Sequence, residues 1–194
     1  MAFFKRHNRM APTYESASTR QFKHGRTETI RVCCGEAKEM VHAVSDPSVN
    51  EREKALKVRA FLSAHRKLLV DATNGQGVDR HILGLRCMVN PNEQMPKVFT
   101  PADPLFSRAL SFDLSTSNVS PGDLYDGLGF GLATTSGYGV NYSISRDSIR
   151  YCVTCVNDVN DTDKASKFGN MVADCLVQLR GILLNQSVNM TSKI

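Results

Sequence analysis

The chain has 194 residues, 41% of them hydrophobic and 22% charged, a length that fits one domain and a composition that excludes a disordered chain. No apolar run reaches the roughly 18 residues that a membrane span needs, so we expect no transmembrane segment. The 24 basic and 19 acidic side chains are interspersed, and tryptophan is absent, which favours a solvated helix face and argues against nucleic-acid binding.

The first clear helical pattern covers residues 48–73, where apolar side chains recur at the i, i+3 and i+4 spacing of a buried helix face. Asn50 is a suitable N-cap, and Glu53 stands at the position of its capping-box partner. A second helix is predicted from about Gln76 to Met88. Residues 89–108 contain four prolines and are predicted to form a loop.

Strand-like segments follow at 111–115, 137–144 and 148–156, the last two joined by a predicted hairpin turn at 145–147. A final helix with one apolar stripe is predicted to begin near Asp161. This order of elements indicates a mixed α+β (α/β) fold, with a layer of helices packed against a sheet.

Six cysteines are present, and Cys152 and Cys155 form a C-x-x-C within one of the predicted strands. Residues three apart on a strand point to opposite faces, so these two thiols cannot bind one metal ion. We therefore expect free thiols and no metal site.

Two polar segments of the first half could bind a small molecule. Residues 12–31 combine tyrosine, hydroxyls, glutamate and three arginines without a clear helical or strand period, so they could surround a ligand or simply form a polar loop. Arg80 lies in the first turn of the second predicted helix. Its guanidinium could fork onto a carboxylate or phosphate of a ligand, or it could pair with Asp79 or another nearby acid.

Two further segments lie in the second half. Ser115 and Ser117 are two residues apart, so on an extended chain their hydroxyls face the same side and could donate to one oxyanion. A hydroxyl-rich strand end is the alternative. The glycines at 127, 129, 131 and 137 allow close approach of the backbone to a ligand or equally to another strand.

In this order, the segments TYESAS with GRTETIR, DRHILGL, STS and GYGVNY resemble the carnitine/choline acyltransferase family over nearly the whole chain. The resemblance implies a chloramphenicol-acetyltransferase-like sheet packed by helices. It also implies reversible acyl transfer between a coenzyme A thioester and the carnitine hydroxyl, with a histidine as general base. Carnitine and acyl-coenzyme A are the implied substrates, and no tightly bound cofactor is expected.

The presence of Thr27 and Arg80 favours the carnitine branch, because the choline enzymes lack the threonine and arginine that bind a carboxylate. Ser115 and Ser117 are implied at the reaction centre, with Ser117 donating to the oxyanion. Leu128 corresponds to an acyl-pocket position, and neighbouring segments most resemble octanoyl-type members. The other implied contacts are Tyr14, Ser16, Thr27, Arg80 and Phe130 for carnitine, and Arg66, Glu15 and Asn118 for coenzyme A.

The resemblance places the general-base histidine in a half of the enzyme that precedes these motifs. None of the five histidines (His7, His24, His42, His65 and His81) stands in the corresponding context. We therefore expect residues 1–185 to form the C-terminal portion of a two-domain enzyme, followed by a flexible tail at 186–194, and to be inactive without the N-terminal half.

Two alternatives remain open at this point. The chain could be a truncated, non-catalytic isoform, or it could be a regulatory or binding module whose basic first half holds an anionic partner. The last residues, Ser192-Lys193-Ile194, differ by one residue from the peroxisomal Ser-Lys-Leu signal. The expected location is therefore the peroxisome or the mitochondrion, and otherwise the cytoplasm.

Overall fold

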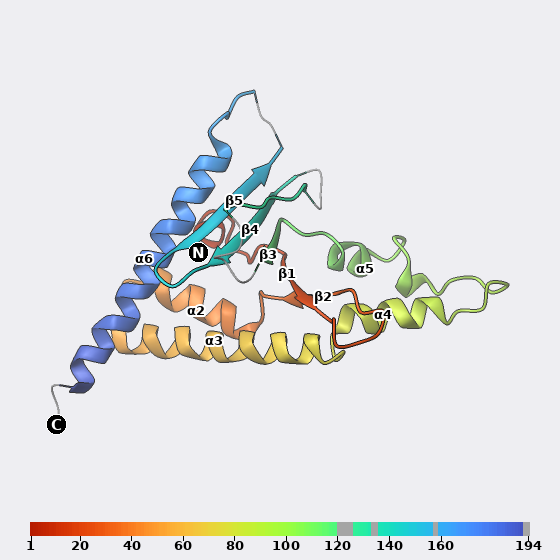
Figure 1. Ribbon diagram of the computed structural model, residues 1–194, viewed down its shortest axis with the longest axis horizontal. Helices are drawn as coiled ribbons and strands as arrows, with labels where there is room; N and C mark the ends of the chain where they lie inside the picture. The colour runs from red at the N-terminus through yellow and green to blue at the C-terminus, as the bar shows by residue number, and fades with distance from the viewer. Residues whose placement is uncertain (120–125, 133–135, 157–158, 192–194) are drawn as a thin grey trace.

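A computed structural model describes residues 1–119, 126–132, 136–156 and 159–191, with side chains up to residue 185. Its centre is a five-stranded sheet in the order β2-β1-β3-β4-β5 (Figure 1). The fold is therefore mixed α+β, as the sequence predicted. The strands are β1 (Thr13–Ser18), β2 (Thr27–Arg31), β3 (Leu114–Asn118), β4 (Tyr138–Ile144) and β5 (Ile149–Cys155).

The sheet combines two antiparallel hairpins around a parallel centre. Strand β1 pairs antiparallel with β2 and parallel with β3, while β4 pairs parallel with β3 and antiparallel with β5. The predicted turn between the last two strands is confirmed, since the Ser145 N–H donates to the Ser148 carbonyl at 2.9 Å. Parallel pairing brings β1 beside β3, although about a hundred residues separate them in the chain.

The helices are α1 (Ala2–His7), α2 (Gly35–Ser45), α3 (Glu51–Thr73), α4 (Val78–Cys87), α5 (Pro104–Ala109) and α6 (Lys164–Thr191), with a 3-10 turn η1 (Lys97–Phe99). The predicted cap of α3 is confirmed, because the Asn50 side chain accepts from the Glu53 N–H at 2.9 Å. No helix in the described part of the chain has both the length and the apolar character that crossing a bilayer requires.

The long helices bury one face of the sheet. Ala17 and Ile30 from the first hairpin pack on Ala72 of α3, and the Tyr151 hydroxyl of β5 donates to the Gly169 carbonyl of α6 at 2.9 Å. A second cluster joins α2, α3 and α6 through apolar side chains. Its buried members are Met40, Val41, Val44, Ala55, Val58 and Ile182.

Three sequence predictions differ from the structure. Residues 12–31, which showed no regular period, contain β1 and β2. The strand predicted at 111–115 lies at Leu114–Asn118. The predicted loop at 89–108 contains η1 and most of α5, which begins at Pro104 because Asp103 accepts from the Leu105 and Phe106 N–H groups. In each case the backbone conformation depends on local side-chain hydrogen bonds or on strand partners that are distant in the chain.

The final helix continues to Thr191, beyond residue 185, where the predicted tail begins. Residues 192–194, which carry the possible peroxisomal signal, lie outside the described residues. In Figure 1 the C-terminal turns of α6 and the region from α4 to α5 extend from opposite ends of the molecule.

Candidate functional site: a hydroxyl face beside an unpaired arginine

One face of the sheet is lined with hydroxyl groups, and we call it the hydroxyl face. Strand register places Tyr14 beside Ser115, and the next same-side pair is joined by a bond of 2.9 Å in which the Ser16 hydroxyl donates to the Ser117 hydroxyl. The prediction that Ser115 and Ser117 share a side is confirmed. The face comprises Tyr14, Ser16, Thr27, Thr29, Ser115 and Ser117.

Strand β2 extends this face on one side and β4 on the other. Thr27 and Thr29 lie opposite Ser18 and Ser16, and Asn141 lies opposite Ser117, whose carbonyl accepts from the Asn141 amide at 3.2 Å. Thr29 and Asn141 were not among the predicted site residues. The period-two spacing of Thr27 and Thr29 was available in the sequence, but it could be used only once this segment was known to be a strand.

The segment at 127–131 crosses the same face near β4 and β5. The Thr154 hydroxyl donates to the Phe130 carbonyl at 3.0 Å, and a side chain at Gly139 would come within 3.0 Å of the Phe130 ring. A side chain at Gly129 would similarly come within 3.1 Å of the Cys152 sulfur. Gly129 and Gly139 therefore allow this segment to pack closely on strands β4 and β5. Phe130 is therefore close to the hydroxyl face, whereas Leu128 is exposed.

Arg80 lies at the outer edge of the sheet, in the first turn of α4. Its Nε donates to the Thr27 carbonyl at 2.6 Å, so the guanidinium is held at the edge strand next to the hydroxyl face. Among the described residues, no carboxylate lies within ion-pair distance of Arg80. Its two terminal nitrogens are not engaged by any carboxylate there.

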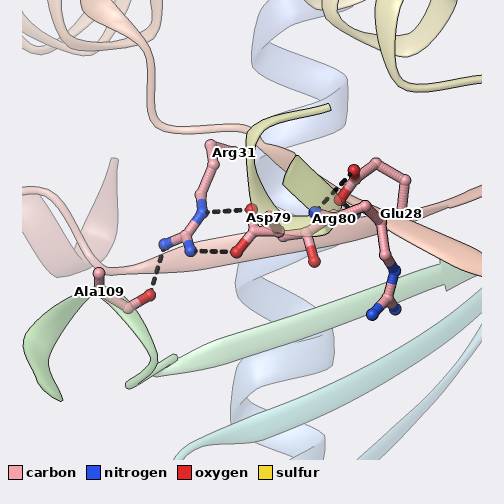
Figure 2. A network of polar contacts seen from close by, with 6 residues as sticks. Glu28, Arg31, Asp79, Arg80 and Ala109 are labelled. Carbon is pink, nitrogen blue, oxygen red and sulfur yellow. Dashed lines mark hydrogen bonds and ion pairs between the residues drawn. The ribbon is translucent and has the colours of Figure 1, made fainter. Parts of the chain in front are cut away.

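Asp79, the obvious ion-pair partner for Arg80 in the sequence, pairs with a different arginine. Arg31 forks onto it, with Nε donating to Oδ2 at 3.0 Å and Nη2 donating to Oδ1 at 2.6 Å (Figure 2). Figure 2 shows the Arg80 guanidinium pointing away from this pair. The alternative in which Asp79 neutralises Arg80 is therefore wrong.

A buried glutamate fixes the start of α4. Glu28 is 1% exposed, and its carboxylate accepts from the Arg80 N–H at 3.1 Å and from the Thr29 N–H at 2.6 Å (Figure 2). A carboxylate at a helix N-terminus satisfies otherwise unpaired N–H groups and interacts favourably with the helix dipole. Gly77, the N-cap residue, leaves room for this carboxylate, which any side chain at position 77 would overlap.

The residues assigned to coenzyme A are not gathered in one place. Glu15 is buried on the helix-covered side of β1, where it accepts from the Thr116 hydroxyl and the Asn118 N–H. Burial raises the pKa of Glu15 and, together with the Glu15 charge, raises the pKa of Tyr142 to about 12. Arg66 is exposed on α3. The structure thus brings Glu15 and Asn118 together, but it does not bring Arg66 to them.

No group of three or more His, Cys, Asp or Glu side chains among the described residues is arranged to hold a metal ion. His65, on α3, is half-buried, and burial lowers its pKa. In the same part of the chain, no hydrogen bond joins a histidine to Ser115 or Ser117. The chemistry that these residues offer is hydrogen-bond donation by hydroxyls and anion binding by a guanidinium.

Similarity to known proteins identifies the family of the chain. The model of the choline/carnitine O-acyltransferase family matches residues 1–174. Over 160 residues, the chain is 39% identical to the peroxisomal carnitine O-octanoyltransferase of Homo sapiens, covering 80% of this chain and 25% of the relative.

Two other relatives match nearly the whole chain. The carnitine O-acetyltransferase of Columba livia is 31% identical over 184 residues, covering 94% of this chain and 29% of the relative. The choline O-acetyltransferase of Sus scrofa is 33% identical over 191 residues, covering 96% and 29%. This chain thus spans under a third of the length of these relatives, and it belongs to the choline/carnitine O-acyltransferase family.

Proposed function

We propose that the chain supplies the carnitine-binding and oxyanion-stabilising residues of a carnitine O-acyltransferase. The observation that carries this proposal is Arg80, which has no carboxylate partner among the described residues and is held beside Thr27 at the border of the hydroxyl face. A guanidinium with two available terminal nitrogens matches a carboxylate in shape and charge. Choline has no carboxylate, so a site of this kind favours carnitine.

The other groups of the site fit the remaining parts of carnitine. Thr27, whose carbonyl holds Arg80, and Ser16 and Tyr14, which lie further along the hydroxyl face, are assigned to the same carboxylate. Phe130, which lies near the other end of the hydroxyl face, offers an aromatic ring to the trimethylammonium group. Phe130 therefore adds an aromatic ring to the face that carries the hydroxyls.

The proposed reaction is direct transfer between two substrates, with acyl-coenzyme A as the donor. The carnitine hydroxyl attacks the thioester carbonyl while a general base takes the hydroxyl proton. The tetrahedral oxyanion then collapses, the carbon–sulfur bond breaks, and the base returns that proton to the departing coenzyme A sulfur. Because Ser16 donates to Ser117, the hydroxyl hydrogen of Ser117 is available to the oxyanion that forms during the attack. Ser115 lies two residues away on the same side.

We assign the general base to a part of the enzyme outside this chain, with residues 1–185 as its C-terminal portion. The surface area supports a missing partner: the chain exposes 13436 Å², against about 9,100 Å² for a folded monomer of this mass. Large apolar side chains are exposed on three helices, as expected of a surface that another part of a protein covers. They include Leu56, Leu62, Leu69, Leu83, Leu85, Leu176 and Val177.

We assign coenzyme A contacts to Glu15, Asn118 and Arg66, and an acyl-pocket position to Leu128. Medium acyl chains are the favoured substrates, which the 39% identity to an octanoyltransferase supports. That relative is named as peroxisomal, so the peroxisome is the proposed location, with the mitochondrion as the alternative. Fusion of the last residues to a fluorescent protein tests the location: a signal spread through the cytoplasm contradicts a C-terminal peroxisomal signal.

The carnitine site is tested by titrating carnitine and choline into the chain and observing side-chain NMR signals. We expect carnitine to shift signals of Arg80 and Tyr14, and choline to leave Arg80 unchanged. The variant R80N should lose the carnitine response, whereas R59N, the same change at an exposed arginine of α3, should retain it. An unchanged carnitine response in R80N contradicts the assignment.

A second assay addresses activity. The chain is mixed with octanoyl-coenzyme A and carnitine, and free coenzyme A is measured. We expect no turnover above the uncatalysed rate, because no histidine of the chain is hydrogen-bonded to the serines among the described residues. Robust turnover would show that the chain contains its own general base.

A further inference from the structure

We propose that Arg31 is a positioning residue that holds Arg80 and Tyr14 in place for one shared ligand. The proposal rests on the proposed function, since it concerns the same carboxylate site. Each of the three guanidinium nitrogens of Arg31 donates a hydrogen bond to the protein, so we assign Arg31 a positioning role and no contact with that ligand.

The first connection runs from Arg31 to Arg80 through Asp79. The two-bond fork between Arg31 and Asp79 ties the first turn of α4 to the end of β2. Arg80 is the next residue in that turn, so the fork sets the position from which its side chain reaches the Thr27 carbonyl. The same fork occupies both oxygens of Asp79, which leaves Arg80 without the acid that stands next to it in the sequence.

The second connection runs from Arg31 to Tyr14 through Phe112. The Arg31 guanidinium carbon lies 4.9 Å from the centre of the Phe112 ring, which meets the Tyr14 ring edge-on at 4.7 Å between centroids. Register also places Arg31 directly opposite Tyr14 on the neighbouring strand. The ring of Phe112 is therefore held between the cation and the tyrosine.

A third contact fixes the guanidinium itself. Its Nη1 donates to the Ala109 carbonyl at the end of α5, at 2.5 Å. Three directed bonds and a stacked ring use the planar shape of arginine, and the ammonium group of lysine cannot reproduce them. The variant R31K therefore keeps the positive charge but removes the planar group that makes the three hydrogen bonds and the ring contact.

The test compares R31K and D79N with the control R59K, using the intact chain without ligand. We expect R31K to shift the Nε–H signal of Arg80 and the ring signals of Tyr14, and to expose the Arg80 Nε–H to faster solvent exchange. D79N should change the Arg80 signal alone, because the Phe112 contact remains. R59K should change neither. Unchanged Arg80 and Tyr14 signals in R31K overturn the proposal.

A double variant tests whether Arg31 acts on Arg80 through Asp79. If it does, R31K/D79N changes the Arg80 signal no further than D79N alone. Additive changes overturn this route. Should R31K fail to fold, D79N tests the connection to Arg80 and F112L tests the connection to Tyr14, and a lack of response in both overturns the proposal.

Measuring the binding of carnitine and choline distinguishes a failure of this proposal from a failure of the proposed function. We expect R31K to weaken carnitine binding by about tenfold to a hundredfold, as for displaced binding groups, and to leave choline binding unchanged. A general loss of structure would weaken both. If the unaltered chain binds no carnitine, the proposed function fails for this chain, and the ligand-free signals of Arg80 and Tyr14 still decide whether Arg31 positions them.

Discussion

The two faces of the sheet are built from the same short strands, yet they differ in almost every physical respect. On the helix-covered face, Ala17 and Ile30 pack on α3, and each carboxylate oxygen of the buried Glu28 accepts a backbone N–H. On the hydroxyl face, Ser16 and Ser117 bond to one another. Alternation along a strand thus gives one face of the sheet apolar side chains that pack and the other face a set of hydroxyl groups.

The largest expected effect of a single substitution lies on the helix-covered face. I30A should lower the free energy of unfolding by about 3 kcal/mol, because it removes buried methyl groups and leaves a cavity. The matched change T29A, one residue earlier on the hydroxyl face, should cost about 1 kcal/mol or less. Urea unfolding measures both, and equal losses would contradict the difference between the faces.

A smaller effect is expected at the start of α4. G77A should destabilise the chain by about 1–2 kcal/mol, because the added methyl group overlaps the Glu28 carboxylate. G84A, in the same helix and with nothing within 4 Å of the added atom, should instead stabilise it by about 0.5–1 kcal/mol. Thermal unfolding of the two variants therefore moves in opposite directions. A stabilised G77A contradicts the close approach of Glu28.

The hydroxyls of Thr116 and Ser117, which lie on opposite faces of β3, should also differ in their contribution to the free energy of unfolding. T116V removes a donor from the buried Glu15 and should cost about 1–2 kcal/mol. S117A removes a hydroxyl of the hydroxyl face and should cost about 0.5 kcal/mol. The comparison is made by chemical denaturation at neutral pH. If S117A is the more costly change, the hydroxyl face has a larger structural role than proposed here.

The smallest effect concerns the pH dependence of stability. Burial raises the pKa of Glu15, so the protonated carboxyl is the form that favours the folded state. This contribution to the free energy of unfolding is lost as the pH rises above 4.5, the usual pKa of a glutamate, because the carboxyl then ionises. Relative to E15Q, the unaltered chain should therefore lose stability as the pH rises above 4.5. Denaturation at several pH values checks the sign.

The control for that measurement is E39Q. Lys57 lowers the pKa of the exposed Glu39, so this carboxylate stabilises the chain above its usual pKa, and the stabilisation is lost as the pH falls. The two variants should therefore show opposite slopes against pH. Equal slopes would contradict the burial of Glu15.

Local signals allowed the sequence to predict α3 and the shared side of Ser115 and Ser117. The Asn50 cap and the period-two geometry of a strand depend only on residues a few positions apart. The first hairpin was missed because Glu28 occupies an inward position where an apolar residue is usual. Its partner, the Arg80 N–H, is 52 residues away, so no local pattern explains a carboxylate there.

The side chains that pair with one another around the candidate site also could not be predicted from neighbouring residues in the sequence. Asp79 stands next to Arg80, but neighbouring residues on a helix do not face each other, and Arg31 reaches Asp79 from 48 residues away. The family resemblance predicted carnitine-binding roles for Arg80 and Thr27 without showing which contacts hold these residues. The coenzyme A roles of Glu15, Asn118 and Arg66 remain a prediction, since Glu15 and Asn118 lie together but Arg66 lies apart from them on α3.

The exposed leucines of α3, α4 and α6 have a consequence for the cell as well as for the fold. Chaperones and proteases recognise apolar side chains that a finished protein would cover. A polypeptide that left these side chains uncovered would be bound or degraded soon after synthesis. Its abundance would then be set by protein quality control, whatever the integrity of the carboxylate site.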